Sequence, residues 1–255
     1  MDGGRRYIVL FGDSHIHAIQ DALKSRPQSG DVAFEVRRLL KQKANAPRAR
    51  SSPRAGLIGD TSFEAFVRVA AALTERDVLV SVIGGNQHAV FSTIRHPQPF
   101  DFYSPEASQV PVEKGVSLIP YRMIYDQFLR GLRKGDGMTL AALRNATRAK
   151  MVHLLAPPPK HKNAFIELYH DTHFAAEGIE NFGVSPPALR MKFWHLQNRV
   201  LAEICAELGI EVIAPPPAAL DAQGFLERSC YAGDATHANV KYGEFVLADL
   251  ERRFA

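Results

Sequence analysis

The sequence predicts an α/β fold, specifically a three-layer α/β/α domain around a flavodoxin-like parallel sheet of about five strands. Three observations support this. Short, mainly apolar runs recur along the chain, which is typical of strands buried on both faces of a sheet. Longer segments with apolar residues at helical spacing alternate with these runs, and glycines or prolines end most of them. No linker or internal repeat interrupts the 255 residues, so residues 1–255 are interpreted as one domain.

The first predicted strand and the turn after it contain the first candidate functional residue. Residues 7–11 form an apolar run that stops at Gly12-Asp13, and helical spacing begins from His15. Ser14 is thereby expected at the carboxyl end of a strand, above a helix N-terminus, where open α/β sheets bind ligands. Ser14 is a candidate nucleophile on this reasoning. Asp13 or Ser14 as a plain helix N-cap is the alternative.

The remaining elements follow in order. Residues 32–40 are a second apolar stretch, residues 56–60 a turn, and residues 61–64 have capping-box spacing before a helix that ends near residue 76. Further strands are expected over residues 78–83, 151–155 and 211–213, and helices over 121–132, 138–149, 185–208 and 240–254. Residues 91–120 and 160–187 are expected to be irregular, and the aromatic content of the first insert favours a pocket wall or lid.

Composition narrows the classes of partner. The net charge is +4, and much of the excess lies between Arg37 and Arg54, which suggests a solvated loop or an anionic substrate more than a nucleic-acid face. No apolar run approaches the ~18 residues of a membrane span. Two cysteines make no disulfide framework, and the six residues before the first apolar run lack the apolar core expected of a signal peptide. We therefore expect a cytoplasmic protein that binds neither nucleic acid nor membrane. Its oligomeric state stays open.

Four turns carry polar groups near the predicted carboxyl edge of the sheet. They read Gly12-Asp13-Ser14, Ile58-Gly59-Asp60-Thr61, Gly84-Gly85-Asn86-Gln87 and Asp234-Ala235-Thr236-His237. In this order they resemble the four sequence blocks of the SGNH, or GDSL-type, hydrolase family. The resemblance spans nearly the whole chain and implies a serine esterase that needs no cofactor and no metal.

The resemblance also implies roles. Ser14 would attack the ester carbonyl, His237 would take and return its proton, and Asp234 would orient the imidazole. The N–H groups of Ser14 and Gly59 and the amide of Asn86 would surround the oxyanion. The implied substrate is a small-molecule ester, such as a small acyl group on a carbohydrate.

One departure from the family pattern and three neighbouring residues qualify this assignment. The third block of the family usually reads Gly-x-Asn-Asp, whereas Gln87 stands in the last position here. A neutral Gln87 can still hydrogen-bond to Asn86 but brings no charge. Asp13, His15 and His88 adjoin the expected site and are candidates for binding substrate, while solvated or helix-capping roles suit the two histidines as well.

Two other functions remain open at this point. A metal-dependent phosphoesterase or hydrolase could use Asp13, His15, Asp60 and His237, because carboxylates and neutral imidazoles suit a dinuclear site. An acyltransferase or a binding relative of the same fold is the other alternative. An intact Ser14, Asp234 and His237 argues against a dead site but does not separate transfer from hydrolysis.

Overall fold

A computed structural model describes residues 5–26, 32–40 and 58–255 of the chain. Within these residues six strands form one parallel sheet in the order β3-β2-β1-β4-β7-β8. The strands are β1 (Arg6–Gly12), β2 (Val32–Leu39), β3 (Ile58–Thr61), β4 (Val78–Val82), β7 (Lys150–Leu154) and β8 (Glu211–Ile213). The predicted fold class is confirmed, and the sheet has one strand more than expected.

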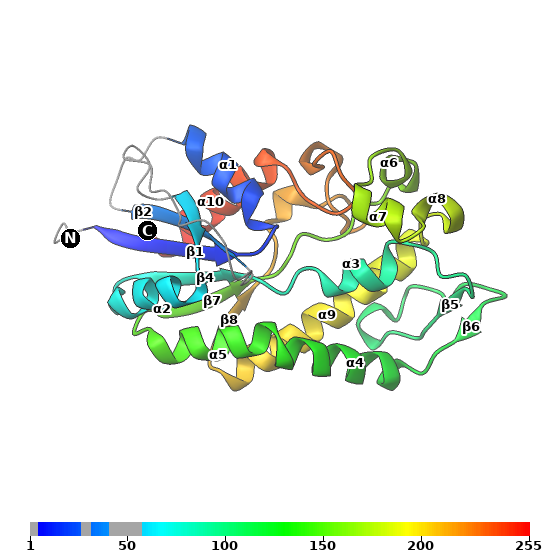
Figure 1. Cartoon of the computed structure of the whole chain (residues 1–255), viewed down its shortest axis with the longest axis horizontal. Helices are drawn as coiled ribbons and strands as arrows, with labels where there is room; N and C mark the ends of the chain where they lie inside the picture. The colour runs from blue at the N-terminus through cyan, green and yellow to red at the C-terminus, as the bar shows by residue number, and fades with distance from the viewer. Residues whose placement is uncertain (1–4, 27–31, 41–57) are drawn as a thin grey trace.

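Helices cover both faces of this sheet (Figure 1). Helices α1 (Ile16–Ser25) and α10 (Val240–Phe254) pack on one face. Helices α2 (Phe63–Ala72), α4 (Tyr121–Lys134), α5 (Asp136–Ala146) and α9 (Pro187–Glu207) pack on the other. Alternate residues of β1 enter the two cores, Ile8 and Leu10 on one side and Val9 and Phe11 on the other. This two-sided burial explains why the strand reads as an uninterrupted apolar run.

The two inserts are more ordered than the sequence suggests. The first contains the end of α3 (Gln87–Ser92), a small parallel pair of β5 (Phe100–Asp101) with β6 (Ser117–Leu118), and a 3₁₀ turn. The second contains three short helices, α6 (Asn163–Leu168), α7 (Thr172–Ala176) and α8 (Ile179–Phe182). These pieces gather at one end of the molecule, beyond the carboxyl ends of the strands (Figure 1). The prediction of irregular structure over residues 160–187 is therefore wrong.

Other boundaries differ by a few residues. Residues 58–61 are strand β3 and not part of a turn, and Ser62 caps α2 by accepting from the Ala65 backbone N–H at 3.2 Å. Helix α5 begins at Asp136, so Gly135 alone separates it from α4. Most of the expected basic loop, residues 41–54, lies outside the described residues. No helix in the described part of the chain is long and apolar enough to cross a membrane.

The topology selects one crevice. From β1 the chain moves through β2 to β3 on one side, and then returns to add β4, β7 and β8 on the other. The order therefore reverses between β1 and β4. Open α/β sheets bind ligands outside the carboxyl ends of the strands at such a switch point.

Candidate functional site

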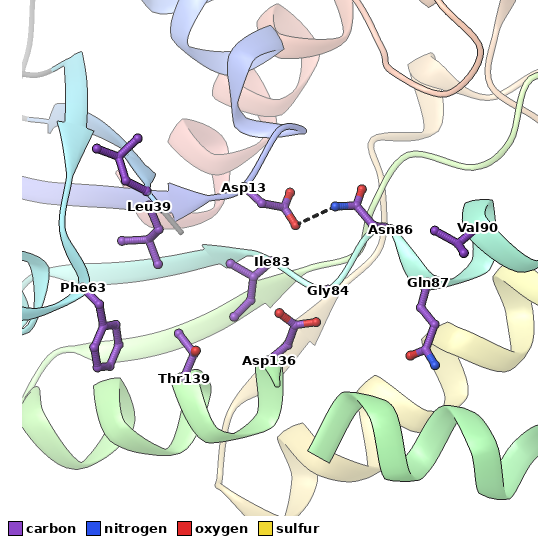
Figure 2. Close-up of a pocket in the computed structure, with 11 residues that line it drawn as sticks. Asp13, Leu39, Phe63, Ile83, Gly84, Asn86, Gln87, Val90, Asp136 and Thr139 are labelled. Atoms are coloured by element: carbon purple, nitrogen blue, oxygen red, sulfur yellow. Dashed lines mark hydrogen bonds between the residues drawn. The ribbon is translucent and has the colours of Figure 1, made fainter. Parts of the chain in front are cut away.

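The turns after β1 and β4 meet at the switch point. Asp13 follows β1 and Asn86 follows β4, and the Asn86 Nδ2 donates to Asp13 Oδ2 at 3.3 Å (Figure 2). The other Asp13 oxygen accepts from the His15 backbone N–H at 3.3 Å. An amide nitrogen has two hydrogens. Asp13 therefore orients the Asn86 side chain and leaves its second N–H for another acceptor.

A carboxylate–imidazole pair lies in the loop before α10. Asp234 Oδ2 lies 2.8 Å from His237 Nδ1, and Asp234 Oδ1 accepts from the backbone N–H groups of Thr236 and His237 at 2.8 and 2.7 Å. Burial alone would raise the pKa of Asp234, but these hydrogen bonds and the adjacent imidazole hold it well below its usual range. The carboxylate is thus ionised at neutral pH and fixes the orientation of the His237 ring.

The loop carrying His237 reaches the turn after β1. The rings of His15 and His237 lie against each other, with centroids 5.1 Å apart. Ser14 directly precedes His15, and its carbonyl accepts from the His17 N–H at 3.3 Å in the first turn of α1. Among the described residues no hydrogen bond commits the Ser14 hydroxyl, either as a cap of α1 or to His237. The structure therefore brings together the segments that hold Ser14, His237 and Asp234, with the serine hydroxyl uncommitted.

The histidines beside the site are buried, which corrects the expectation that they are solvated. His15 and His88 are 6% and 5% exposed, and neither caps a helix with its side chain. Burial lowers the pKa of His15, and it lowers the pKa of His88 to about 3 with a further contribution from the neighbouring His15. Both rings are consequently neutral near pH 7.

The His15 ring occupies the space where a side chain at position 85 would lie, so this position suits glycine. A Cβ atom at Gly85 would lie 2.4 Å from His15 Cδ2, closer than non-bonded atoms can approach. The preceding Gly84 has φ of +79°, which lets the chain turn sharply out of β4. The glycine pair of the third block is therefore explained locally by a turn and by a close contact.

Gln87, the expected support of Asn86, and Gly59, an expected oxyanion donor, are placed differently from the prediction. Among the described residues no hydrogen bond joins Gln87 to Asn86. The Gln87 amide lies against Gly131 of α4, where an added Cβ would approach Gln87 Nε2 to 2.7 Å. The support comes from Asp13 instead. Gly59 pairs with Arg37 of β2, which pairs with Phe11 of β1, so Gly59 lies about 10 Å from β1 across β2. Gly59 is not among the donors that the structure brings to Ser14.

A cavity of about 680 Å³ opens beside the Asp13–Asn86 contact. Its walls come from the sheet edge and from α2, α3 and α5 (Figure 2). Polar and apolar side chains both line it, namely Asp13, Leu39, Leu40, Phe63, Ile83, Asn86, Gln87, Val90, Asp136 and Thr139, together with Gly84. The size and the mixed lining suit an organic molecule with both hydrogen-bonding and apolar parts.

The residues of the metal-dependent alternative do not converge. Asp60 lies in β3, where its carboxylate faces Arg38 at 3.9 Å, whereas His15 and His237 contact each other beyond β1. Within the described ranges no three His, Cys, Asp or Glu side chains form a group suited to hold a metal ion.

Sequence reasoning missed two polar residues near the site. Gln197 of α9 accepts from the His88 backbone N–H at 2.7 Å, which fixes the start of α3. Lys160 is fully buried beneath the loop that holds Asp234. Neither residue stands in a motif. Lysine is usually exposed, so its position in the sequence carried no signal.

The fold and the site together define an α/β protein with polar groups converging at the switch point of a parallel sheet. No family model and no curated protein matches the chain. A search of solved structures finds chains with a similar backbone arrangement. One is 11% identical with a TM-score of 0.45, over 98% of this chain and 96% of the other. A second is described as a putative platelet activating factor from Streptococcus pneumonia. It is 10% identical with a TM-score of 0.42, over 100% of this chain and 86% of the other. Neither similarity bears on the activity.

Proposed function

We propose that this chain is a serine esterase of the SGNH type, with Ser14 as nucleophile, His237 as general base and Asp234 as its orienting carboxylate. The observation that carries the proposal is the 2.8 Å Asp234–His237 contact in a loop whose imidazole packs against the residue following Ser14. A nucleophile beside an imidazole that is itself fixed by a carboxylate is the arrangement that acyl transfer requires.

The oxyanion would be stabilised by two groups at the same crevice. The Ser14 backbone N–H lies at the start of α1, whose dipole favours negative charge, and Asn86 has one N–H to spare. The mixed cavity beside Asn86 supports a polar organic ester as substrate, with an acylated carbohydrate as the candidate class. His237 would return its proton to the leaving alcohol.

The proposal is tested with a fluorophosphonate probe and mass spectrometry of the intact protein. We expect one adduct, on Ser14, which is lost in Ser14→Ala and strongly slowed in His237→Ala. Hydrolysis of a short-chain chromogenic ester should fall in parallel by at least about 10³-fold and should persist in the presence of a chelator. Ester hydrolysis that survives Ser14→Ala but not chelation would refute the proposal in favour of metal-dependent chemistry.

A further inference from the structure

Lys160 occupies an unusual position for a lysine. Its side chain has no solvent exposure, and its ammonium lies over the rings of Phe165 and Tyr231, at 4.9 and 5.2 Å from their centroids. A buried ammonium pays a large desolvation penalty, and an apolar side chain of similar length would fill the same space without it. The presence of a charge here therefore calls for a reason other than packing.

The ammonium is bonded to the loop that carries the proposed base. Lys160 Nζ donates to the carbonyl oxygens of Ala232, at 2.8 Å, and of Asp234, and it lies 3.7 Å from Asp234 Oδ1. Burial lowers the pKa of Lys160 to about 8, with the nearby Asp234 carboxylate opposing that effect, so the side chain is charged at neutral pH. Lys160 thus contacts both the backbone and the carboxylate of the residue that orients His237.

The other contacts of the loop with its surroundings are mainly between side chains. Tyr231 and Ala238 pack in the core that contains Ile8 and Leu10 of β1, Ala235 packs against the second insert, and the His237 ring lies against His15. The two ends of the loop pair with each other, Tyr231 with Ala238, and the Ala232 N–H donates to the His237 carbonyl at 3.1 Å. Asp234 bonds within the loop as well. These internal contacts give the loop its shape. Lys160 adds the polar link between Asp234 itself and the segment after β7.

Lys160 itself is held rigidly from the other side. Arg190 of α9 is 2% exposed, and its Nη2 donates to the carbonyl oxygens of Lys160 and His161 at 2.8 and 3.2 Å. Its Nη1 donates to Asn163 Oδ1 at 2.9 Å and to the Ser185 carbonyl. The segment after β7 is thereby fastened to the longest helix of the described chain, and Lys160 extends that rigid support to the loop before α10.

We propose that Lys160 is a positioning residue of the site, which anchors the 231–238 loop so that His237 and Asp234 face Ser14. The inference rests on the proposed esterase function for its kinetic consequence but not for its structural one. Its ammonium does not touch the reacting atoms. Lys160 acts through Asp234, and Arg190 holds the backbone of Lys160 and His161 in place.

Kinetics provide the first test. Replacement by a neutral chain of similar length, Lys160→Met, should lower kcat about 10–100-fold, because displacement of a base by about 1 Å has effects of that size. KM should change by less than about twofold, since the cavity is lined by other elements. The matched control Lys114→Met, an exposed lysine in the first insert, should behave as wild type. An unchanged kcat in Lys160→Met would overturn the proposal.

A second test measures the geometry of the Asp234–His237 contact without relying on enzyme activity. In a Ser14→Ala background, proton NMR should show a downfield resonance for the proton between His237 Nδ1 and Asp234, assigned by its loss in His237→Gln. Adding Lys160→Met should broaden or shift this resonance, whereas Lys114→Met should not. An unaltered resonance would overturn the proposal. Failure of the esterase assignment would instead appear as hydrolysis that survives Ser14→Ala while the resonance still responds to Lys160→Met.

Chemical rescue separates the charge of Lys160 from its volume. Lys160→Ala leaves a cavity between the two aromatic rings, which a propylammonium ion can fill and charge. Saturable recovery of kcat with propylammonium, and none with propanol, is the expected result. Equal recovery with both additives would show that only volume matters and would refute an anchoring role for the charge.

Discussion

His153 offers a quantitative test of the burial found beneath the site. It lies in β7 with no exposed surface, and its Nδ1 is 3.1 Å from the Ser81 hydroxyl on the adjacent β4. Its Nε2 has no hydrogen-bond partner among the described residues. Burial lowers the pKa of His153 to about 4. An unfolded chain would bind a proton at this residue near pH 6.5.

The sign of the effect follows from that difference. Below about pH 6.5 the unfolded state binds a proton that the folded state refuses, so stability is lost as the pH falls toward 4. Each unit of pKa difference is worth about 1.4 kcal/mol. Between pH 7 and pH 4.5, His153 alone should therefore cost the wild-type protein about 2 kcal/mol.

The assay compares urea unfolding of wild type with that of His153→Gln at both pH values. Glutamine keeps a hydrogen-bonding group for Ser81 and does not titrate, and the other histidines contribute equally to both proteins. The free energy of unfolding of wild type should fall by about 2 kcal/mol more than that of the variant. Parallel losses would refute the reasoning, because they would mean that His153 accepts a proton in the folded state at no cost.

Two further predictions concern the site and its supporting insert. Asp13→Ala should lower kcat for ester hydrolysis by about 10–100-fold, because Asn86 loses the acceptor that orients it. Asp13→Asn keeps an acceptor oxygen and should lose less activity. Equal rates in wild type and both variants would contradict this role of Asp13. Lys192 and Asp101 form a buried ion pair, with Nζ 2.9 Å from both carboxylate oxygens. Lys192→Met should destabilise the protein by about 3–5 kcal/mol in urea unfolding, because it leaves the Asp101 carboxylate buried without its cation; an unchanged free energy of unfolding would contradict this.

Much of the sheet could be predicted because its strands are buried on both faces. A short apolar run such as residues 78–82, in a chain where such runs alternate with helical segments, is best explained as a buried strand. Strand β3 was missed because Ile58-Gly59-Asp60-Thr61 contains residues typical of turns, and only its pairing with β2 makes it a strand. The short helices α6, α7 and α8 have four to six residues each, too few to show helical periodicity.

The site was predictable where one segment contains both partners. Asp234 and His237 are three residues apart, so their contact needed only a local turn. The contact of Asp13 with Asn86 depends on two strands lying side by side, 73 positions apart in the chain, and no local pattern announces it. The same holds for Lys160, whose burial is decided by Arg190 and by the aromatic rings around it.

The contact between Gly85 and His15 constrains how this crevice can evolve. Because a Cβ atom at position 85 would overlap the imidazole, a larger residue there requires the ring to move or to be replaced. A small residue in place of the histidine removes the two closest contacts of that Cβ atom, and the contact with Ala156 Cβ at 3.0 Å remains. Divergence at this edge of the sheet therefore favours coordinated changes at positions 15 and 85.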